Sequence, residues 1–326
     1  MFDLLEPRLL ADIGGTHARF AIDVDGATGA IATLRCADYA GLAEAIGAYV
    51  QQPAAHARGA ARVQHAAIAI ANPVDGDTIA MTNHHWRFSV SALRDQLCWQ
   101  RLAVVNDFEA LALAVPSLQA HDIVRVGGGE GVPDAAIALL GAGTGLGASG
   151  LIKTTHGWKA LQAEGGHVSF APVDALEVQV LQYAWREHPH VSAERLLSGM
   201  GLELLYRALC LLRHGSEASL PLTAPEIIQR GLERSCNICD ETIELFCRML
   251  GTIAANLALS LGSRGGVYIG GGIVPRLGAR FAASGFRARF DCHGRFSDYL
   301  AKIPVFVITA EHATLRGVAT LLRPND

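Results

Sequence analysis

The stretch IALLGAGTGLGASGLI, residues 137–152, reads as a strand, a tight glycine turn and a second strand. Ile137 to Leu140 is apolar, four glycines surround Thr144, and the chain turns apolar again at Leu151. Glycine takes positive φ freely and lets another group approach the backbone, so the turn predicts an anion on backbone N–H groups, with the Thr144 hydroxyl beside it. An ordinary β-hairpin, whose glycines only satisfy turn geometry, explains one such turn equally well.

A second stretch near the N-terminus has the same pattern and favours the anion-binding interpretation. It reads LLADIGGTHARFAI, residues 9–22, with a strand before Gly14, Gly15 and Thr16 and an alternating strand after them. Neither turn continues as G-K-[ST] into a helix, and neither opens a helix as G-x-G-x-x-G does. Two such hairpins predict two related halves. The sequence here resembles the superfamily of sugar kinases, heat-shock ATPases and actin, in which paired phosphate hairpins from two domains hold a nucleotide.

Length and composition indicate a globular protein with a small-molecule partner. The chain has 326 residues, which suits two domains with a substantial core. Half the residues are apolar, 18% are charged and the net charge is −4, so neither disorder nor nucleic-acid binding is indicated. An odd number of cysteines, seven, suits a reducing compartment. No signal-peptide pattern and no long apolar run occur, so we expect no membrane association and a cytoplasmic protein.

Strand and helix patterns indicate an α/β chain whose second half repeats the first. The first half predicts a three-strand meander, a helix and two buried strands, at residues 9–12, 18–23, 31–36, 39–51, 66–71 and 102–105. The second half restarts with strands at residues 137–140, 148–153 and around 158–161, which supports an internal duplication. Residues 240–261 carry apolar side chains at helical spacing and predict a long core helix that stops at Gly262. A buried strand then ends in Gly270, Gly271 and Gly272, a third glycine loop.

Asn106 and Asp107 follow a buried strand and precede a helix predicted from Phe108 to Ala114. Ligands of open α/β sheets gather at the carboxyl ends of strands. Considered without its context, Asp107 fits the N-cap position of that helix as well as it fits a catalytic role. With three glycine loops indicating a nucleotide, we expect Asp107 to accept a proton from a substrate hydroxyl, and Asn106 to orient that hydroxyl.

The segment EGGH, Glu164 to His167, holds a carboxylate and an imidazole at a sharp bend. Such a pair can accept from and donate to the vicinal hydroxyls of a sugar, and the alternative is a turn with one structural histidine. Five other histidines lack metal-ligand spacing and are interpreted as surface or loop residues: His84, His85, His156, His188 and His190. Cys236 and Cys239 form a C-x-x-C without a second pair or a flanking histidine, which disfavours a metal site.

Seven motifs make the resemblance specific. The motifs DIGGT, TNHHW, NDFEALAL, GAGTGLG, EGGHVSFAP, VSAERLLSG and GGVYIGGGIVP have the order and separations found in the proteobacterial type of glucokinase, over nearly the whole chain. The resemblance implies an α/β, two-domain actin-like (ribonuclease H-like) ATPase fold with a nucleotide and sugar cleft between the domains. It implies a small α/β domain at 1–117 plus 308–326 and a large α/β domain with helical insertions at 118–307. It also implies a homodimer.

The same resemblance implies roles for individual residues. Asp12 supports the Mg²⁺ of ATP through water, while Gly14, Gly15 and Thr16 form the first phosphate loop. Gly143, Thr144 and Gly145 form the second phosphate loop, and Gly270, Gly271 and Gly272 line the adenosine pocket. Glucose is held by Asn106, Asp107, Glu164, His167 and Glu194, with Asp107 as the base and with Asn83 and Gly145 nearby. A related group of sugar kinases and repressors has a cysteine-rich zinc motif after its EGGH-like segment, and residues 170–174 contain no cysteine, so no zinc is expected.

The implied activity is phosphorylation of D-glucose by ATP to glucose 6-phosphate, the entry step of glycolysis. His17, Met200 and Arg316 depart from residues common in the family. One alternative is therefore a sugar sensor of the same fold with little turnover, and another is a kinase with broader hexose specificity. An actin-like or chaperone ATPase, which hydrolyses ATP without a sugar, would have no use for EGGH.

Overall fold

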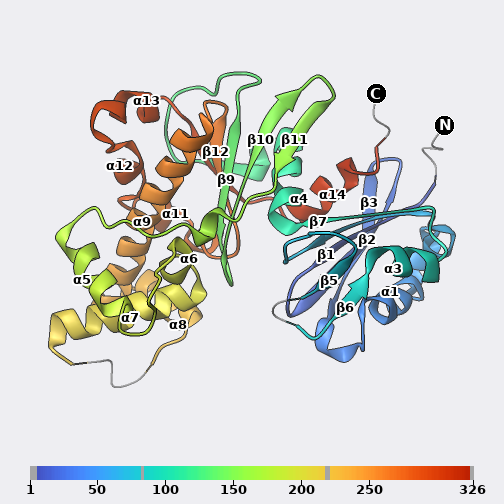
Figure 1. The fold of residues 1–326 in the computed structure, drawn as a ribbon, viewed down its shortest axis with the longest axis horizontal. Coiled ribbons are helices and arrows are strands. Elements are labelled where there is room, and N and C mark those ends of the chain that lie inside the picture. Colours follow the sequence, from blue (N-terminus) through green and yellow to red (C-terminus); the bar gives the residue numbers. More distant parts are fainter. Residues whose placement is uncertain (1–5, 82–83, 217–220, 324–326) are drawn as a thin grey trace. The chain divides into compact units, whose positions relative to one another are not determined.

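The computed structural model describes residues 6–81, 84–216 and 221–323. The chain divides into two compact units, each with its own sheet and hydrophobic core (Figure 1). Unit 1 comprises Met1–Leu118, Thr154–Gln162 and Ala310–Asp326, and unit 2 comprises Gln119–Lys153 and Ala163–Thr309. The C-terminal helix therefore belongs to the same unit as the first strands.

Unit 1 is built on a sheet with the strand order β3-β2-β1-β4-β7. Its strands are β1 (Arg8–Ile13), β2 (His17–Val24), β3 (Ala27–Arg35), β4 (His65–Ile70) and β7 (Arg101–Asn106). β1 pairs antiparallel with β2 and parallel with β4, and β4 pairs parallel with β7. β4 is buried along its whole length, as its continuous apolar sequence predicts. A separate short hairpin joins β5 (Thr78–Ala80) to β6 (Arg87–Ser89).

Helices cover both faces of this sheet. On one face, α1 (Leu42–Val50), α2 (Pro53–Ala57) and α3 (Val90–Gln96) contribute to a core with alternate side chains of the strands. On the other face, α4 (Asp107–Ala114) and α14 (Ala313–Thr320) pack on the remaining side chains. α14 contacts α4, β1 and β4, and β11 (Gly157–Leu161) also packs against α4. The last helix thus packs on the N-terminal sheet, as the family resemblance implies.

Unit 2 repeats the strand pattern of unit 1. Its strands have the order β10-β9-β12-β13-β8. They are β8 (Ile123–Arg125), β9 (Ile137–Ala142), β10 (Leu146–Thr154), β12 (Gly266–Gly270) and β13 (Val305–Ile308). β9 pairs antiparallel with β10 and parallel with β12, and β12 pairs parallel with β13. The predicted internal duplication is confirmed, and the fold is a two-domain actin-like ATPase fold.

The long helix α9 (Asn237–Leu261) organises the core of unit 2. It packs against α7 (Gly199–His214), α8 (Ala224–Leu232), α12 (Phe286–Asp291) and the strands β9 and β12. It ends at Gly262, whose φ of 60° is the left-handed cap expected there. By length and composition α9 could cross a membrane, but 72% of its most apolar window is buried, which suits a core helix.

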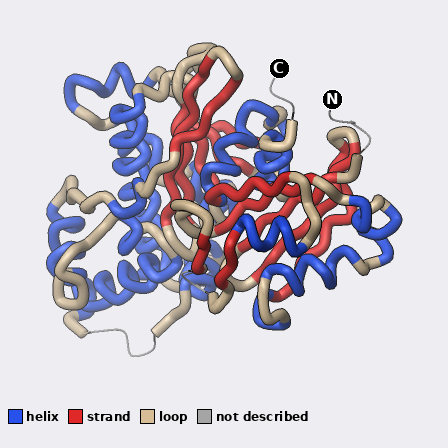
Figure 2. The backbone as a smooth tube through the Cα atoms, turned by 45° about the vertical axis from the view of Figure 1, so that its right-hand side comes forward, coloured by secondary structure: helices blue, strands red, loops and turns tan. Residues whose placement is uncertain are grey.

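Shorter helices complete unit 2. Figure 2 shows the helices of both units in blue and the strands in red. These helices are α5 (Ala175–Ala184), α6 (Ala193–Leu196), α10 (Val274–Leu277), α11 (Ala279–Ala282) and α13 (Ser297–Ala301). α10 has proline in its first turn, where the missing N–H of proline is not needed.

Candidate active site

The first glycine hairpin connects β1 to β2 and presents a tip suited to an anion. The N–H of Gly14 donates to the carbonyl of His17 at 3.0 Å, and the carbonyl of Thr16 accepts from the N–H of Cys36 at 2.9 Å. Among the described residues, the N–H groups of Gly15 and Thr16 reach no backbone carbonyl, and Thr16 is exposed. Two backbone donors and one hydroxyl are therefore available to an anion at this tip.

Asp12 lies on β1, just before the tip, opposite Arg19 on β2. The guanidinium of Arg19 donates to Asp12 Oδ2 at 3.2 Å. Burial raises the pKa of the Asp12 carboxyl, and the charges of Arg19 and His312 oppose that effect without cancelling it. A further cation beside this partly buried carboxyl group would stabilise its charged form. Asp12 is therefore suited to supporting Mg²⁺ through water.

Asn106 and Asp107 stand at the junction of β7 and α4. Asn106, and not Asp107, is the N-cap of the helix: its Oδ1 accepts from the N–H groups of Phe108 at 2.9 Å and Glu109 at 3.4 Å. Asp107 is the first residue of α4, one position earlier than the predicted start, and its Oδ1 accepts from the N–H of Phe108 at 2.9 Å. The cap fixes the first turn and so places the Asp107 carboxyl at the carboxyl end of β7.

The second glycine hairpin, between β9 and β10, is held against the third glycine loop. The N–H of Gly143 donates to the carbonyl of Gly145 at 2.8 Å and closes the turn. The N–H of Ile273 donates to the carbonyl of Ala142 at 3.1 Å. Gly271 has a φ of 81°, and a Cβ there would overlap that carbonyl. Glycine is therefore required where these loops meet.

The N-terminus of α7 also contacts the second hairpin, because the N–H of Gly199 donates to the carbonyl of Gly143 at 2.9 Å. Thr144, at the tip, is exposed, and its N–H reaches no backbone carbonyl among the residues that the structure describes. The candidate phosphate and adenosine residues of unit 2, namely Gly143, Thr144, Gly145, Gly270, Gly271 and Gly272, thus form one connected set of loops.

The EGGH segment packs on the same hairpin. A Cβ on Gly166 would overlap the carbonyl oxygen of Leu146, and a Cβ on Gly165 would lie 2.8 Å from the Cβ of Ala148. Only glycine allows the bend to come this close to β10. The two glycines therefore hold Glu164 and His167 beside the second hairpin.

Glu194, in α6, reaches that hairpin from another segment. Its Oε2 accepts a hydrogen bond from the N–H of Leu146 at 2.9 Å, and a Cβ on Gly145 would overlap the same oxygen. The segments are aligned by backbone hydrogen bonds, from the N–H of Phe170 to the carbonyl of Val191 at 3.0 Å and from Ala193 to Val168 at 2.8 Å. The structure thus brings Gly145, Glu164, His167 and Glu194 together within unit 2.

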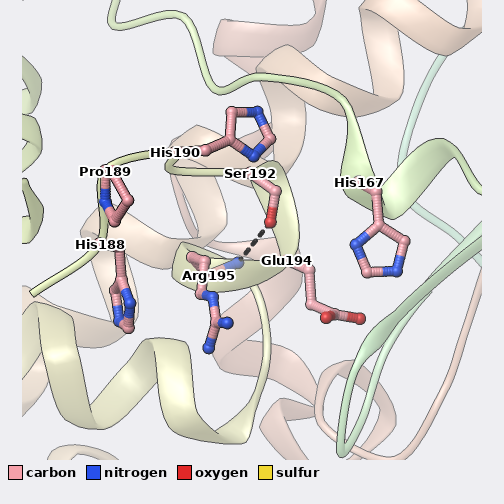
Figure 3. Close-up of a pocket in the computed structure, with 7 residues that line it drawn as sticks. All are labelled: His167, His188, Pro189, His190, Ser192, Glu194 and Arg195. Atoms are coloured by element: carbon pink, nitrogen blue, oxygen red, sulfur yellow. Dashed lines mark hydrogen bonds between the residues drawn. The ribbon is translucent and has the colours of Figure 1, made fainter.

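His167 and Glu194 line one pocket of about 350 Å³ (Figure 3). The remaining lining residues come from the loop before α6 and from its first turn, and they are His188, Pro189, His190, Ser192 and Arg195. Nε2 of His190 lies 3.0 Å from the hydroxyl of Ser169, and the hydroxyl of Ser192 accepts from the N–H of Arg195 at 3.3 Å. His188 and His190, interpreted from the sequence only as surface or loop residues, contribute to a pocket.

Comparisons with known proteins show the family of the chain. The family model for glucokinase matches residues 9–325. A glucokinase of Chromobacterium violaceum is 52% identical over 318 residues, which cover 97% of this chain and 89% of that protein. The chain belongs to the glucokinase family.

Other relatives of this glucokinase-family chain differ in length. A "Bifunctional protein glk" of Paraburkholderia xenovorans is 50% identical over 317 residues, and while 97% of this chain is aligned, it spans only 49% of that protein. Among solved structures, a glucokinase from an Antarctic psychrotroph has a TM-score of 0.85 and 36% identity, with 99% of each chain covered. The family identified from the motifs is confirmed.

Within this glucokinase-family chain, Glu164 and His167 are loosely paired. Nε2 of His167 and Oε2 of Glu164 are 3.9 Å apart, and both side chains are 59% exposed. A pair this exposed gains little from its own attraction, so both groups can turn to a ligand at small cost. The candidate residue Asn83 lies outside the described residues. Over residues 6–81, 84–216 and 221–323, no group of three or more His, Cys, Asp and Glu is placed to hold a metal ion.

Proposed function

We propose that this chain transfers the γ-phosphoryl group of ATP to the 6-hydroxyl of D-glucose, giving glucose 6-phosphate. The observation that carries the proposal is the arrangement around Leu146, where the Glu194 carboxylate accepts from its N–H and the EGGH bend packs on the second glycine hairpin at Gly166, a position that accepts only glycine. A hydroxyl-binding set and a phosphate-type loop are thereby joined in one rigid unit. Membership of the glucokinase family supports glucose as the substrate for this arrangement.

The proposed sugar contacts in unit 2 are Glu164, His167 and Glu194. The family resemblance adds Asn106 and Asp107. Carboxylates accept from sugar hydroxyls, while the imidazole can donate or accept, so the set can bind several hydroxyls at once. An inverted hydroxyl would leave one of these polar groups unpaired, which costs about 1–3 kcal/mol. The set therefore favours one hexose stereochemistry over another.

The proposed nucleotide contacts are the two glycine hairpins and the third glycine loop. The N–H groups of Gly15, Thr16 and Thr144, which reach no backbone carbonyl among the described residues, suit phosphate oxygens. Asp12, whose pKa burial raises, would hold Mg²⁺ through water. When bound, Mg²⁺ neutralises charge on the phosphates.

Asp107 is the proposed general base. Its carboxylate would accept the proton of the 6-hydroxyl as that oxygen attacks phosphorus. Phosphoryl transfer asks the protein mainly for positioning and charge neutralisation, so one base beside glycine loops is sufficient. The Asn106 cap supplies the positioning, because it fixes the turn that carries Asp107.

We further propose a cytoplasmic homodimer, as the family resemblance implies. Apolar side chains at and around α5 support an interface on unit 2: Val173, Val178 and Trp185 are 52, 41 and 54% exposed. Burial of such side chains against a second copy is favourable. Sedimentation equilibrium should give twice the mass of one chain, and a monomer at micromolar concentration would contradict the dimer.

Thermal unfolding with candidate sugars tests the proposed activity. Binding to the folded state alone contributes about 2.7 kcal/mol at a hundredfold excess over Kd, and each kcal/mol raises Tm by about 2–4 °C for domains of 150–250 residues. We expect glucose to stabilise without nucleotide, mannose less, and galactose hardly at all. Stabilisation by ATP with no response to any hexose would favour an ATPase, and a glucose response without ADP formation would favour a sensor.

A further inference from the structure

Two thiols lie at the N-terminus of α9, among residues that take no part in the proposed phosphorylation. Cys236 is the N-cap of the helix, with extended backbone angles, and its Sγ accepts from the N–H of Cys239 at 3.4 Å. Cys239 is one turn into α9. Residues three apart in a helix have neighbouring side chains, with Cβ atoms about 5–6 Å apart, and an N-cap residue can adjust further because it lies outside the helix.

The two cysteines also influence each other electrostatically. Burial, and after it the neighbouring Cys236, raises the pKa of Cys239 to about 12, so Cys239 is a protonated thiol at neutral pH. The sulfur of Cys236 receives the backbone N–H of Cys239 at the N-terminus of α9.

Exposure distinguishes the two cysteines. Cys239 is fully buried and packs with Leu222 and Ile227, while Cys236 is only half-buried at the edge of the same cluster. A third thiol, Cys210, lies nearby, and burial raises its pKa. An incoming reagent can therefore reach Cys236 first.

We propose that Cys236 and Cys239 form a reversible disulfide by exchange with a low-molecular-weight disulfide such as oxidised glutathione. The Cys236 thiolate attacks one sulfur of the reagent, which breaks the reagent's S–S bond, forms a mixed disulfide and releases one thiolate. The Cys239 thiol then loses its proton to solvent and attacks the Cys236 sulfur, which forms the internal disulfide and releases the second thiolate. The protein loses two electrons and two protons, and the reagent is reduced to two thiols.

The packing around Cys239 makes oxidation detectable beyond the pair itself. A Cβ on Gly231, in α8, would lie 3.0 Å from the carbonyl oxygen of Cys239, so α8 packs closely on the backbone at this point. A disulfide would also alter the hydrogen bond from the N–H of Cys239 to the sulfur of Cys236. Oxidation should therefore change the contacts between α8 and the start of α9.

The test uses the folded full-length chain carrying Cys98→Ser and Cys292→Ser, because these two thiols are exposed. The protein is incubated with oxidised glutathione, and intact mass and peptide mapping are recorded. We expect the mass to fall by two hydrogens, with a Cys236–Cys239 link that dithiothreitol reverses. In the same background, Cys239→Ala should instead accumulate glutathione on Cys236. Cys236→Ser keeps a hydroxyl as the N-cap and should leave Cys239 unmodified.

Three results would overturn the proposal. They are a lasting glutathione adduct on Cys236 while Cys239 is present, a disulfide from either thiol to Cys210, and no reaction of the folded protein under conditions that modify the unfolded chain. None of these measurements uses glucose or ATP, so their outcome is independent of the proposed kinase activity.

Discussion

The Glu194 carboxylate accepts a hydrogen bond from the backbone N–H of Leu146 at 2.9 Å, and the same oxygen occupies the space that a side chain on Gly145 would need. A residue of α6 is thereby fixed to the tip of a hairpin 48 positions earlier in the chain. The contact joins a proposed glucose ligand to a proposed phosphate loop. The geometry of one set consequently depends on the other.

The first prediction follows from this contact. Gly145→Ala displaces the Glu194 carboxylate, so the KM for glucose should rise by about 10-fold or more, equivalent to about 1–3 kcal/mol. Tm should change little, because a carboxylate at the end of a side chain can move. Gly143→Ala is the matched control, since its Cβ would lie 3.7 Å from the nearest atom, and it should affect the KM for ATP instead. An unchanged glucose KM in Gly145→Ala would contradict the role of Glu194.

A second prediction distinguishes His167, a proposed sugar contact, from His190, which lines the same pocket. His167→Ala removes a proposed hydroxyl partner and should raise the KM for glucose by about 10-fold or more. His190→Ala changes the same pocket, but its imidazole lies 3.0 Å from Ser169 and needs no sugar as a partner. We expect less than a threefold change there. Equal effects in steady-state kinetics would show that the pocket, and not His167 itself, sets the affinity.

The third prediction concerns the helix cap. Asn106→Ala removes the capping oxygen, so the N–H of Glu109 loses its acceptor and the N–H of Phe108 keeps only Asp107 Oδ1, which should lower the free energy of unfolding by about 0.5–2 kcal/mol. Asn106→Ser restores a capping oxygen but is too short to orient a sugar. Urea denaturation should therefore find the serine variant near wild type in stability, and kinetics should find it impaired. If Ser restores both stability and kcat, Asn106 acts only as a cap.

A fourth prediction addresses the ion pairs that hold unit 2. Glu177 is fully buried and its Oε1 accepts from Arg289 at 2.7 Å, so Arg289→Met leaves a buried charge and should cost about 3–5 kcal/mol. Arg207→Met breaks an exposed pair with Glu187 and should cost about 0–1 kcal/mol. Chemical denaturation of the two variants measures the difference. Similar losses in both would show that Glu177 is not dependent on Arg289.

The same cluster determines part of the acid sensitivity. Burial tends to raise the pKa of Asp174, but hydrogen bonds from the N–H of Glu177 and from Arg289, together with the charges of Arg248 and Arg289, more than offset it and lower the pKa. A carboxyl whose pKa is lower in the folded state contributes stability above its unfolded pKa. That stability is lost as the pH falls below about 4, through the folded value. Arg289→Met should make this acid loss shallower.

The glycine pattern predicted much of the fold and of the site because glycine marks places where the backbone itself is constrained. The turn before Thr144 and the end of α9 at Gly262 appear where the sequence indicates them. The capping role of Asn106 could not be assigned, since Asn106 and Asp107 are both good N-caps and only the backbone decides between them.

Contacts between segments that are distant in the chain could not be predicted from the sequence either. The alignment of residues 168–170 with 191–193 brings His190 to the pocket, yet short loop segments carry no periodic pattern that reveals their pairing. The C-x-x-C pattern indicates no metal site, and it does not reveal that the backbone N–H of Cys239 donates to the sulfur of Cys236, which follows from the start of α9 at Asn237. Such features depend on where a helix begins, which sequence patterns define least well.

Asp107 is the proposed general base in the phosphorylation of glucose by ATP. The most direct measurement follows ADP and glucose 6-phosphate together in wild type and in Asp107→Asn, with and without glucose. We expect equal amounts of both products in wild type, no ADP without glucose, and a kcat lower by about 10² to 10⁴ in Asp107→Asn, because the amide cannot take the proton. ADP formation without sugar, or Asp107→Asn turnover within a few-fold of wild type, would contradict the account.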